Sequence, residues 1–213
     1  MTTVLNALAT KIQAFEQQYE QIPQDRQAVL KGIAQTLTQY LQERKDTPEG
    51  VQLIFVCTHN SRRSHIAQLW AQGIAYYYGF HQVRTYSGGT EATAFFLSAV
   101  QAMQHMGFQI EKTNEGANPL YEVHYAQDVE PIRVFSKVFD HESNPQEHFA
   151  AVMTCSHADE NCPYIPGAEK RIPLLYDDPK AFDGTPIAQQ KYDEKAEEIG
   201  RELTFIFEEI SKI

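Results

Sequence analysis

A strongly apolar run, followed at once by a polar loop and a helical pattern, constrains the fold of this chain more than any other feature. The run VQLIFVC at 51–57 is rich in β-branched residues and suits a strand buried on both faces of a parallel sheet. THNSRRS follows at 58–64, and Ile66, Leu69 and Trp70 then open a helical pattern. This order predicts the first strand, loop and helix of a parallel α/β domain.

The alternation of strand and helix patterns continues along the chain. Further strands are expected at 82–89, 150–155 and 171–176, and further helices at 93–106 and 186–211. Between them, residues 121–140 contain two alternating runs around Asp128 and Pro131, which predicts a β-hairpin inside an insertion at 116–148. We therefore expect residues 49–213 to form a doubly wound parallel sheet with helices on both faces.

A pair of helical patterns precedes this domain, within residues 1–48. Pro23 separates the two patterns, and Asp25 is a candidate N-cap for the second helix. The apolar residues at helical spacing are Leu5, Leu8, Ile12, Phe15 and Tyr19 in the first helix and Leu30, Ile33, Leu37, Tyr40 and Leu41 in the second. We expect a helical hairpin whose apolar faces pack on each other and on the main domain. The alternative is a homodimer, or a docking site for a partner, formed through these helices.

Composition limits the function classes open to the chain. Of its 213 residues, 42% are hydrophobic and 22% are charged, as in an ordinary globular protein. A net charge of −10 argues against a nucleic-acid-binding protein, and an anionic substrate would need a local positive site. The sequence shows neither a signal-peptide pattern nor an apolar run of the roughly 18–20 residues that cross a bilayer. We expect a cytoplasmic protein, whose three cysteines are reactive, metal-bound or incidental rather than a disulfide framework.

The chemistry of the chain concentrates at the end of the first strand. Cys57 stands where the strand ends, and Arg63 follows after five residues, where the helix begins. Backbone N–H groups at a helix start bind oxyanions, and a guanidinium fork can hold two oxygens of one tetrahedral anion. The same surroundings favour a thiolate, to which the Ser64 hydroxyl can donate a hydrogen bond. The predicted oxyanion-binding residues are Thr58, His59, Asn60, Ser61, Arg62, Arg63 and Ser64. The alternative is a buried cysteine beside a polar surface turn.

A second candidate feature is the carboxylate pair in LYDDPK at 175–180. Pro179 fixes the local backbone and presses Asp178 towards extended geometry, so the turn can present a carboxylate to a site with little entropic loss. The alternative is an aspartate that caps a turn or a helix, which is the commonest use of Asp-Asp-Pro.

The two remaining thiols, Cys155 and Cys162, follow the strand expected at 150–155. From the residues alone, three interpretations stay open. The thiols are unrelated, or they bind zinc together with His157, although an obvious fourth ligand is lacking. In the third, they form a redox relay, in which one thiolate attacks a bond at Cys57 and the next resolves the disulfide.

The loop resembles a known signature. CTHNSRRS at 57–64 is similar to the loop of the low-molecular-weight protein tyrosine phosphatases, approximately C-x-G-N-x-x-R-S, and matches it at Cys57, Asn60, Arg63 and Ser64. The resemblance implies that Asn60 holds the loop in shape. It also implies that Asp178, in the Asp-Pro pair, is the general acid that protonates a leaving oxygen.

Three positions depart from the phosphatase pattern. His59 replaces a glycine, so we expect a positive φ at this residue. Arg62 stands where many relatives carry a second cysteine, and Lys180 replaces an aromatic residue that flanks the phosphotyrosine ring. The lysine favours a small inorganic oxyanion over an aryl phosphate.

The second pair of thiols resembles the signature of the thioredoxin-coupled arsenate reductases, which share the phosphatase scaffold. Their motif looks like T-x-C-x-x-A-D-x-x-C-P, and it is matched here at Cys155, Ala158, Asp159, Cys162 and Pro163. The resemblance as a whole covers about residues 51–111 and 150–211, and neither the N-terminal helices nor the insertion.

This resemblance implies an enzyme that reduces arsenate to arsenite. Cys57 would attack arsenate, Cys155 would form a disulfide with Cys57, and Cys162 would take over that disulfide. Thioredoxin would reduce the final disulfide as an external reductant, with no resident cofactor or metal. The alternative is a phosphatase that hydrolyses phosphate monoesters through a Cys57 phosphoenzyme, and the third reading is a non-catalytic oxyanion sensor.

Overall fold

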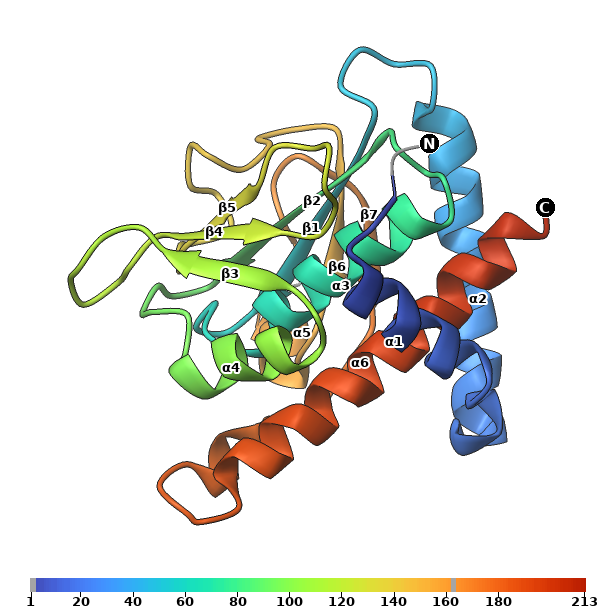
Figure 1. The fold of residues 1–213 in the computed structure, drawn as a ribbon. Helices are drawn as coiled ribbons and strands as arrows, with labels where there is room; N and C mark the ends of the chain where they lie inside the picture. Colours follow the sequence, from blue (N-terminus) through green and yellow to red (C-terminus); the bar gives the residue numbers. More distant parts are fainter. Residues whose placement is uncertain (1–2, 162–163) are drawn as a thin grey trace.

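The computed structural model describes residues 3–161 and 164–213. Its centre is a four-stranded parallel sheet with the strand order β2-β1-β6-β7 (Figure 1). The strands are β1 (Val51–Cys57), β2 (Val83–Gly89), β6 (Phe149–Met153) and β7 (Ala168–Pro173). Every residue of β1 is buried, as expected for a continuous apolar run between two neighbouring strands. The predicted α/β class is confirmed.

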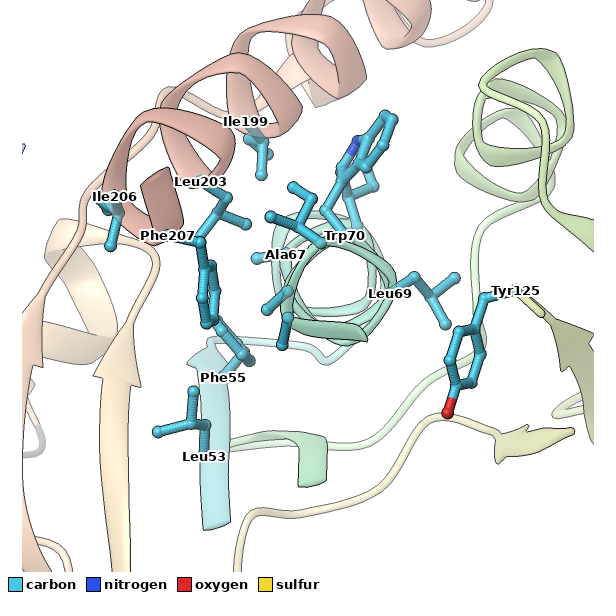
Figure 2. Packing of buried hydrophobic residues seen from close by; sticks show 14 of the residues in the cluster. Leu53, Phe55, Ala67, Leu69, Trp70, Tyr125, Ile199, Leu203, Ile206 and Phe207 are labelled. Atoms are coloured by element: carbon cyan, nitrogen blue, oxygen red, sulfur yellow. The ribbon is translucent and has the colours of Figure 1, made fainter. Parts of the chain in front are cut away.

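The main core lies on one face of the sheet. There α3 (Arg63–Tyr77) lies between the sheet and α6 (Ala188–Ser211), as Figure 2 shows. Leu53 and Phe55 of β1 and Phe207 of α6 belong to this cluster (Figure 2). Because consecutive side chains of a strand point to opposite faces, the residues between and beside them point the other way.

The opposite face carries a much smaller cluster. Ile54 and Val56 of β1 pack there with Met153 and with Ala158 of α5 (Ser156–Asn161). Phe139, which lies in the segment before β6, packs against the same cluster. Helices therefore cover both faces, as predicted, and the cover on this face includes only the short helix α5.

The N-terminal helices join the main core. The region contains α1 (Asn6–Glu16), the short η1 (Tyr19–Gln21) and α2 (Gln24–Arg44), and both α1 and α2 pack against α6 (Figure 1). Phe15 of α1 meets the ring of Trp70 edge-on, with 5.4 Å between the ring centroids. The capping prediction was wrong, because Pro23 occupies the N-cap of α2 and Asp25 lies in its first turn. Dimerisation through these helices stays a prediction.

The insertion contains the expected hairpin. Strands β4 (Tyr121–His124) and β5 (Ile132–Val134) pair antiparallel. A third strand, β3 (Gln109–Lys112), adds to β4 and follows α4 (Leu97–His105). Strand β3 was not predicted from the sequence, because it is short and buries Ile110 alone. Within the described residues, no helix combines the length and the apolar character that a membrane crossing needs.

The approach of α6 to the aromatic core depends on Gly200. A Cβ atom built on Gly200 would lie 2.6 Å from Cε2 of Trp70 and 2.7 Å from Cε2 of Phe15. We therefore expect Gly200→Ala to lower the free energy of unfolding by roughly 1–3 kcal/mol. Gly32→Ala is the matched control, since a Cβ on Gly32 of α2 meets nothing within 4 Å. That substitution should raise the free energy by about 0.5–1 kcal/mol, because it removes only backbone freedom. Urea denaturation measures both, and effects of the same sign would contradict the packing argument.

Candidate active site

Cys57 is the last residue of β1, and its sulfur faces the first turn of α3. The residue is only 3% exposed, and its Sγ lies 3.0 Å from Oγ of Ser64. Nδ2 of Asn60 donates to the same Oγ over 2.9 Å. Because the Ser64 oxygen accepts from Asn60, its own hydrogen is left to donate to the sulfur. Asn60 and Ser64 therefore place a hydroxyl donor directly against the Cys57 sulfur.

The loop presents unused backbone donors. Within the described residues, none of the N–H groups of residues 58–64 makes a backbone hydrogen bond, and no side chain caps the start of α3. Such orphan donors at a helix start, together with the helix dipole, form an oxyanion site. The loop therefore has backbone donors available for an anion.

The left-handed residue of the loop is Asn60 and not His59. Asn60 has φ 43°, and His59 is absent from the described non-glycine residues with positive φ, so the prediction for His59 was wrong. Asparagine tolerates this conformation better than most residues. The buried Asn60 side chain compensates further, since its Oδ1 accepts from N of Lys137 over 2.9 Å.

A glycine at the end of β2 lets the backbone of the loop pack closely against this strand. A Cβ atom on Gly89 would lie 2.6 Å from O of Thr58 and 2.7 Å from N of Asn60. Only glycine allows the loop backbone to approach this strand so closely. The glycine pair at the end of the predicted strand was therefore a usable signal for the loop's position.

Arg63 and Asp178 meet beside the loop. NH2 of Arg63 lies 2.6 Å from Oδ2 of Asp178, and NH1 donates to O of Tyr176 over 2.9 Å. Nε of Arg63 is buried and finds no partner among the described residues. A bound oxyanion would satisfy this donor.

Asp178 also caps a helix, which was the alternative role predicted for it from the sequence. Its Oδ1 accepts from N of Lys180 over 3.0 Å at the start of η2 (Pro179–Phe182). The strand predicted at 171–176 is displaced, since β7 ends at Pro173. Residues 174–178 form a loop instead, and N of Tyr176 donates to O of Thr154 over 3.2 Å. This bond lays the carboxylate segment along the end of β6.

The Arg62 side chain serves the scaffold. Its Nε donates to the hydroxyl of Tyr192 over 2.5 Å, and NH2 lies 2.6 Å from Oδ2 of Asp183. The guanidinium also lies over the ring of Phe96, 4.2 Å from the centroid. Since Asp183 compensates its charge, the predicted anion contact of Arg62 is left to its backbone N–H.

Cys155 lies beside the loop at the end of the neighbouring strand. Val56 pairs with Met153 in register, and N of Thr154 donates to O of Val56 over 2.7 Å. The Cys155 thiol is 1% exposed, its Sγ lies 3.5 Å from Oγ1 of Thr58, and N of Ala158 donates to it over 3.3 Å. Cys57 and Cys155 are both unbridged thiols.

The rest of the second cysteine motif is described in part. Oγ1 of Thr58 also lies 3.4 Å from Nδ1 of His157, and Asp159 forms an ion pair of 2.6 Å with Arg171 of β7. Cys162 and Pro163 lie outside the described residues. The ion pair attaches α5 to the edge of the sheet.

Two residues of the insertion that no sequence pattern indicated also hold the loop. Oγ of Ser136 donates to O of His59 over 3.0 Å and accepts from N of Thr93 over 2.8 Å. Lys137 bonds Asn60 through its N–H, and its carbonyl accepts from N of Gly89 over 2.9 Å. A serine and a lysine in an alternating run are typical of an exposed strand face, so no local signal marks them.

The Lys137 ammonium is buried without a compensating carboxylate. The residue is 4% exposed, its Nζ lies 4.8 Å above the centre of the Phe135 ring, and no described carboxylate forms an ion pair with it. Burial lowers the pKa of Lys137 from its usual 10.5 to about 8. Its charge adds to burial in lowering the pKa of His65, which is therefore neutral. A positive charge thus lies in the layer that supports the loop.

Comparison with solved structures shows the fold class. A low-molecular-weight phosphotyrosine phosphatase from Vibrio cholerae O395 superposes with a TM-score of 0.50 and 15% identity, over 75% of this chain and 95% of its own. A low-molecular-weight protein tyrosine phosphatase from T. tengcongensis gives a TM-score of 0.50 and 17% identity, over 75% of this chain and 99% of its own. The α/β fold is therefore that of the low-molecular-weight phosphatase superfamily.

Comparison with curated proteins shows the family. Arsenate reductase 2 of Staphylococcus epidermidis is 30% identical over 127 residues, which is 60% of this chain and 77% of the relative. Arsenate reductase of Bacillus anthracis is 29% identical over 149 residues, or 70% of this chain and 91% of the relative. No protein-family model matches the sequence. The chain belongs to the arsenate reductase family.

The buried Lys137 should make stability depend on pH. Between about pH 8 and pH 10.5, the unfolded chain binds more protons than the folded chain, so the Lys137 contribution to stability rises with pH. Lys137→Met keeps the apolar stem and removes the buried charge. We expect this variant to exceed the wild type in unfolding free energy by roughly 2–3 kcal/mol at pH 7, with the gap closing as the pH approaches 10.5. Urea denaturation at pH 7 and pH 10 measures the gap, and an unchanged gap would refute the buried charge.

Proposed function

We propose that the protein reduces arsenate to arsenite through a Cys57 adduct and a disulfide relay that ends on thioredoxin. The observation that carries this proposal is the position of Cys155, an unbridged thiol at the carboxyl end of the strand next to Cys57. A phosphatase needs one thiol in this place, whereas a relay needs two within reach of each other. Family membership with proteins named arsenate reductase supports the choice of substrate.

In the first step, the loop binds arsenate and Cys57 attacks it. The orphan N–H groups of residues 58–64 and the guanidinium of Arg63 are the donors available to the anion. The Cys57 thiolate forms a bond to arsenic, and one oxygen departs as water after Asp178 supplies a proton. The bond between Arg63 and Asp178 keeps the acid beside the anion site.

In the following steps, the electrons come from the thiols. The Cys155 thiolate attacks the Cys57 sulfur, the S–As bond breaks with its electron pair on arsenic, and arsenite leaves behind a Cys57–Cys155 disulfide. The Cys162 thiolate then attacks Cys155 and releases Cys57. The dithiol of thioredoxin reduces the resulting Cys155–Cys162 disulfide, so the protein needs no cofactor of its own.

The alternative function is hydrolysis of phosphate monoesters through a Cys57 phosphoenzyme. Cys57, Arg63 and Asp178 would serve that reaction with the same geometry, since arsenate and phosphate are nearly isosteric. Lys180, exposed where the phosphatase pattern has an aromatic residue, offers no ring to flank an aryl group. Arsenate is therefore the substrate that we favour.

The relay predicts a specific failure in Cys162→Ser. With arsenate, thioredoxin, thioredoxin reductase and NADPH, the wild type should turn over repeatedly, whereas Cys162→Ser should release one arsenite per protein and stop. Cys57→Ser should release none, because the nucleophile is missing. NADPH consumption and arsenite release measure these outcomes. Repeated turnover by Cys162→Ser, with thioredoxin as the sole reductant, would defeat the relay.

An aryl phosphate assay separates the two functions. We expect the wild type to hydrolyse p-nitrophenyl phosphate weakly. The Cys155→Ser variant should hydrolyse it at the same rate, since hydrolysis does not use the second thiol. Efficient hydrolysis, combined with no arsenate-dependent NADPH consumption, would replace the reductase by the phosphatase.

A further inference from the structure

Arg26 lies in the N-terminal helix α2, outside the part of the chain that resembles the phosphatase scaffold. Its guanidinium donates two hydrogen bonds to the Glu202 carboxylate of α6, from Nε to Oε1 over 2.9 Å and from NH2 to Oε2 over 2.7 Å. The Glu202 side chain is only 7% exposed, and this fork-to-fork geometry fixes the guanidinium in orientation. Arg26 is thus held rigidly against the main domain.

The same guanidinium contacts the segment that carries Asp178. NH2 of Arg26 donates to O of Leu175 over 3.2 Å, and the guanidinium carbon lies 5.3 Å from the centre of the Tyr176 ring. The carbonyl of Tyr176 in turn accepts from NH1 of Arg63 over 2.9 Å. The segment 174–178 therefore lies between two arginines, one from α2 and one from the oxyanion loop.

We infer that Arg26, oriented by Glu202, is a positioning residue for Asp178, and that the N-terminal helices are part of the active-site architecture. The inference rests on the roles proposed above for Cys57 and Asp178. Residues 174–178 lie beyond the end of β7. Among the described residues, their backbone-to-backbone bonds are those from N of Leu174 to O of Met153 and from N of Tyr176 to O of Thr154. A misplacement of about 1 Å in a reacting group can cost about 100-fold in rate, so a contact that holds this loop affects catalysis without touching substrate.

The test is a double-mutant cycle between Arg26 and Asp178. Arg26→Met combined with Glu202→Gln removes both charges together, so no buried carboxylate is left unpaired. We expect this variant to lower kcat about 10-fold, with KM changed less than about threefold. In an Asp178→Asn background the same pair of changes should lower kcat less than about twofold, because the acid that it positions is already gone. The cycle is measured for arsenate reduction and for p-nitrophenyl phosphate hydrolysis.

A control separates positioning from general stability. Lys11 of α1 forms an ion pair of 2.8 Å with Glu197 of α6, so it also joins the N-terminal helices to α6, and it makes no described bond to residues 174–178. Lys11→Met should leave kcat unchanged. Thermal unfolding of each variant shows whether it is folded at the assay temperature. Arg26→Lys keeps the positive charge but cannot make the two guanidinium bonds to Glu202, so it should recover part of the rate. It replaces the double variant in the test if the double variant is unfolded.

The outcomes are distinguishable. Equal losses of kcat in the wild-type and Asp178→Asn backgrounds, or an equal loss in Lys11→Met, would overturn the positioning role and leave the proposed function intact. If Asp178→Asn itself has no effect on either reaction, the proposed role of the acid fails, and the inference falls with it.

Discussion

The Asn60 side chain joins the loop at 57–64 to Lys137 of the insertion, 77 residues away, and the geometry of the candidate site depends on it. Its Nδ2 orients the Ser64 hydroxyl that contacts the Cys57 sulfur, and its Oδ1 accepts from the backbone of Lys137. The residue is fully buried and has a positive φ, so both ends of the amide compensate a backbone conformation that is costly for most side chains. These bonds therefore fix the Ser64 hydroxyl and the loop backbone that carries the unused N–H groups.

The two segments outside the shared scaffold both support this site. The insertion contributes Ser136 and Lys137 to the loop, and the N-terminal helix α2 contributes Arg26 to the segment that carries Asp178. One set of contacts reaches the loop that follows Cys57, and the other reaches the segment that carries Asp178. Both segments thus contribute contacts to the proposed active site.

The uneven cover of the sheet suits chemistry that moves a thiol. Cys57 and Cys155 belong to the small cluster, together with Ala158 of the six-residue α5, whereas the main core lies on the other face. A local rearrangement of α5 exposes few apolar contacts, so it costs far less than any movement of α3 or α6. The proposed disulfide exchange between the two cysteines therefore does not require movement of Trp70 and its neighbours. The buried charge of Lys137 lies in the layer that supports the loop and does not depend on α5.

Local patterns in the sequence determined the strand, loop and helix at 51–77 and the residue types of the site, including Cys57, Arg63 and Asp178. Periodicity indicates which side of an element is buried, and a short loop between two such elements can adopt few conformations. Only the tertiary structure decided that Arg62 turns towards Asp183, that the left-handed residue is Asn60, and that Ser136 and Arg26 reach the site. These contacts join residues far apart in the chain, and packing selects them from many polar side chains that look equally exposed in sequence.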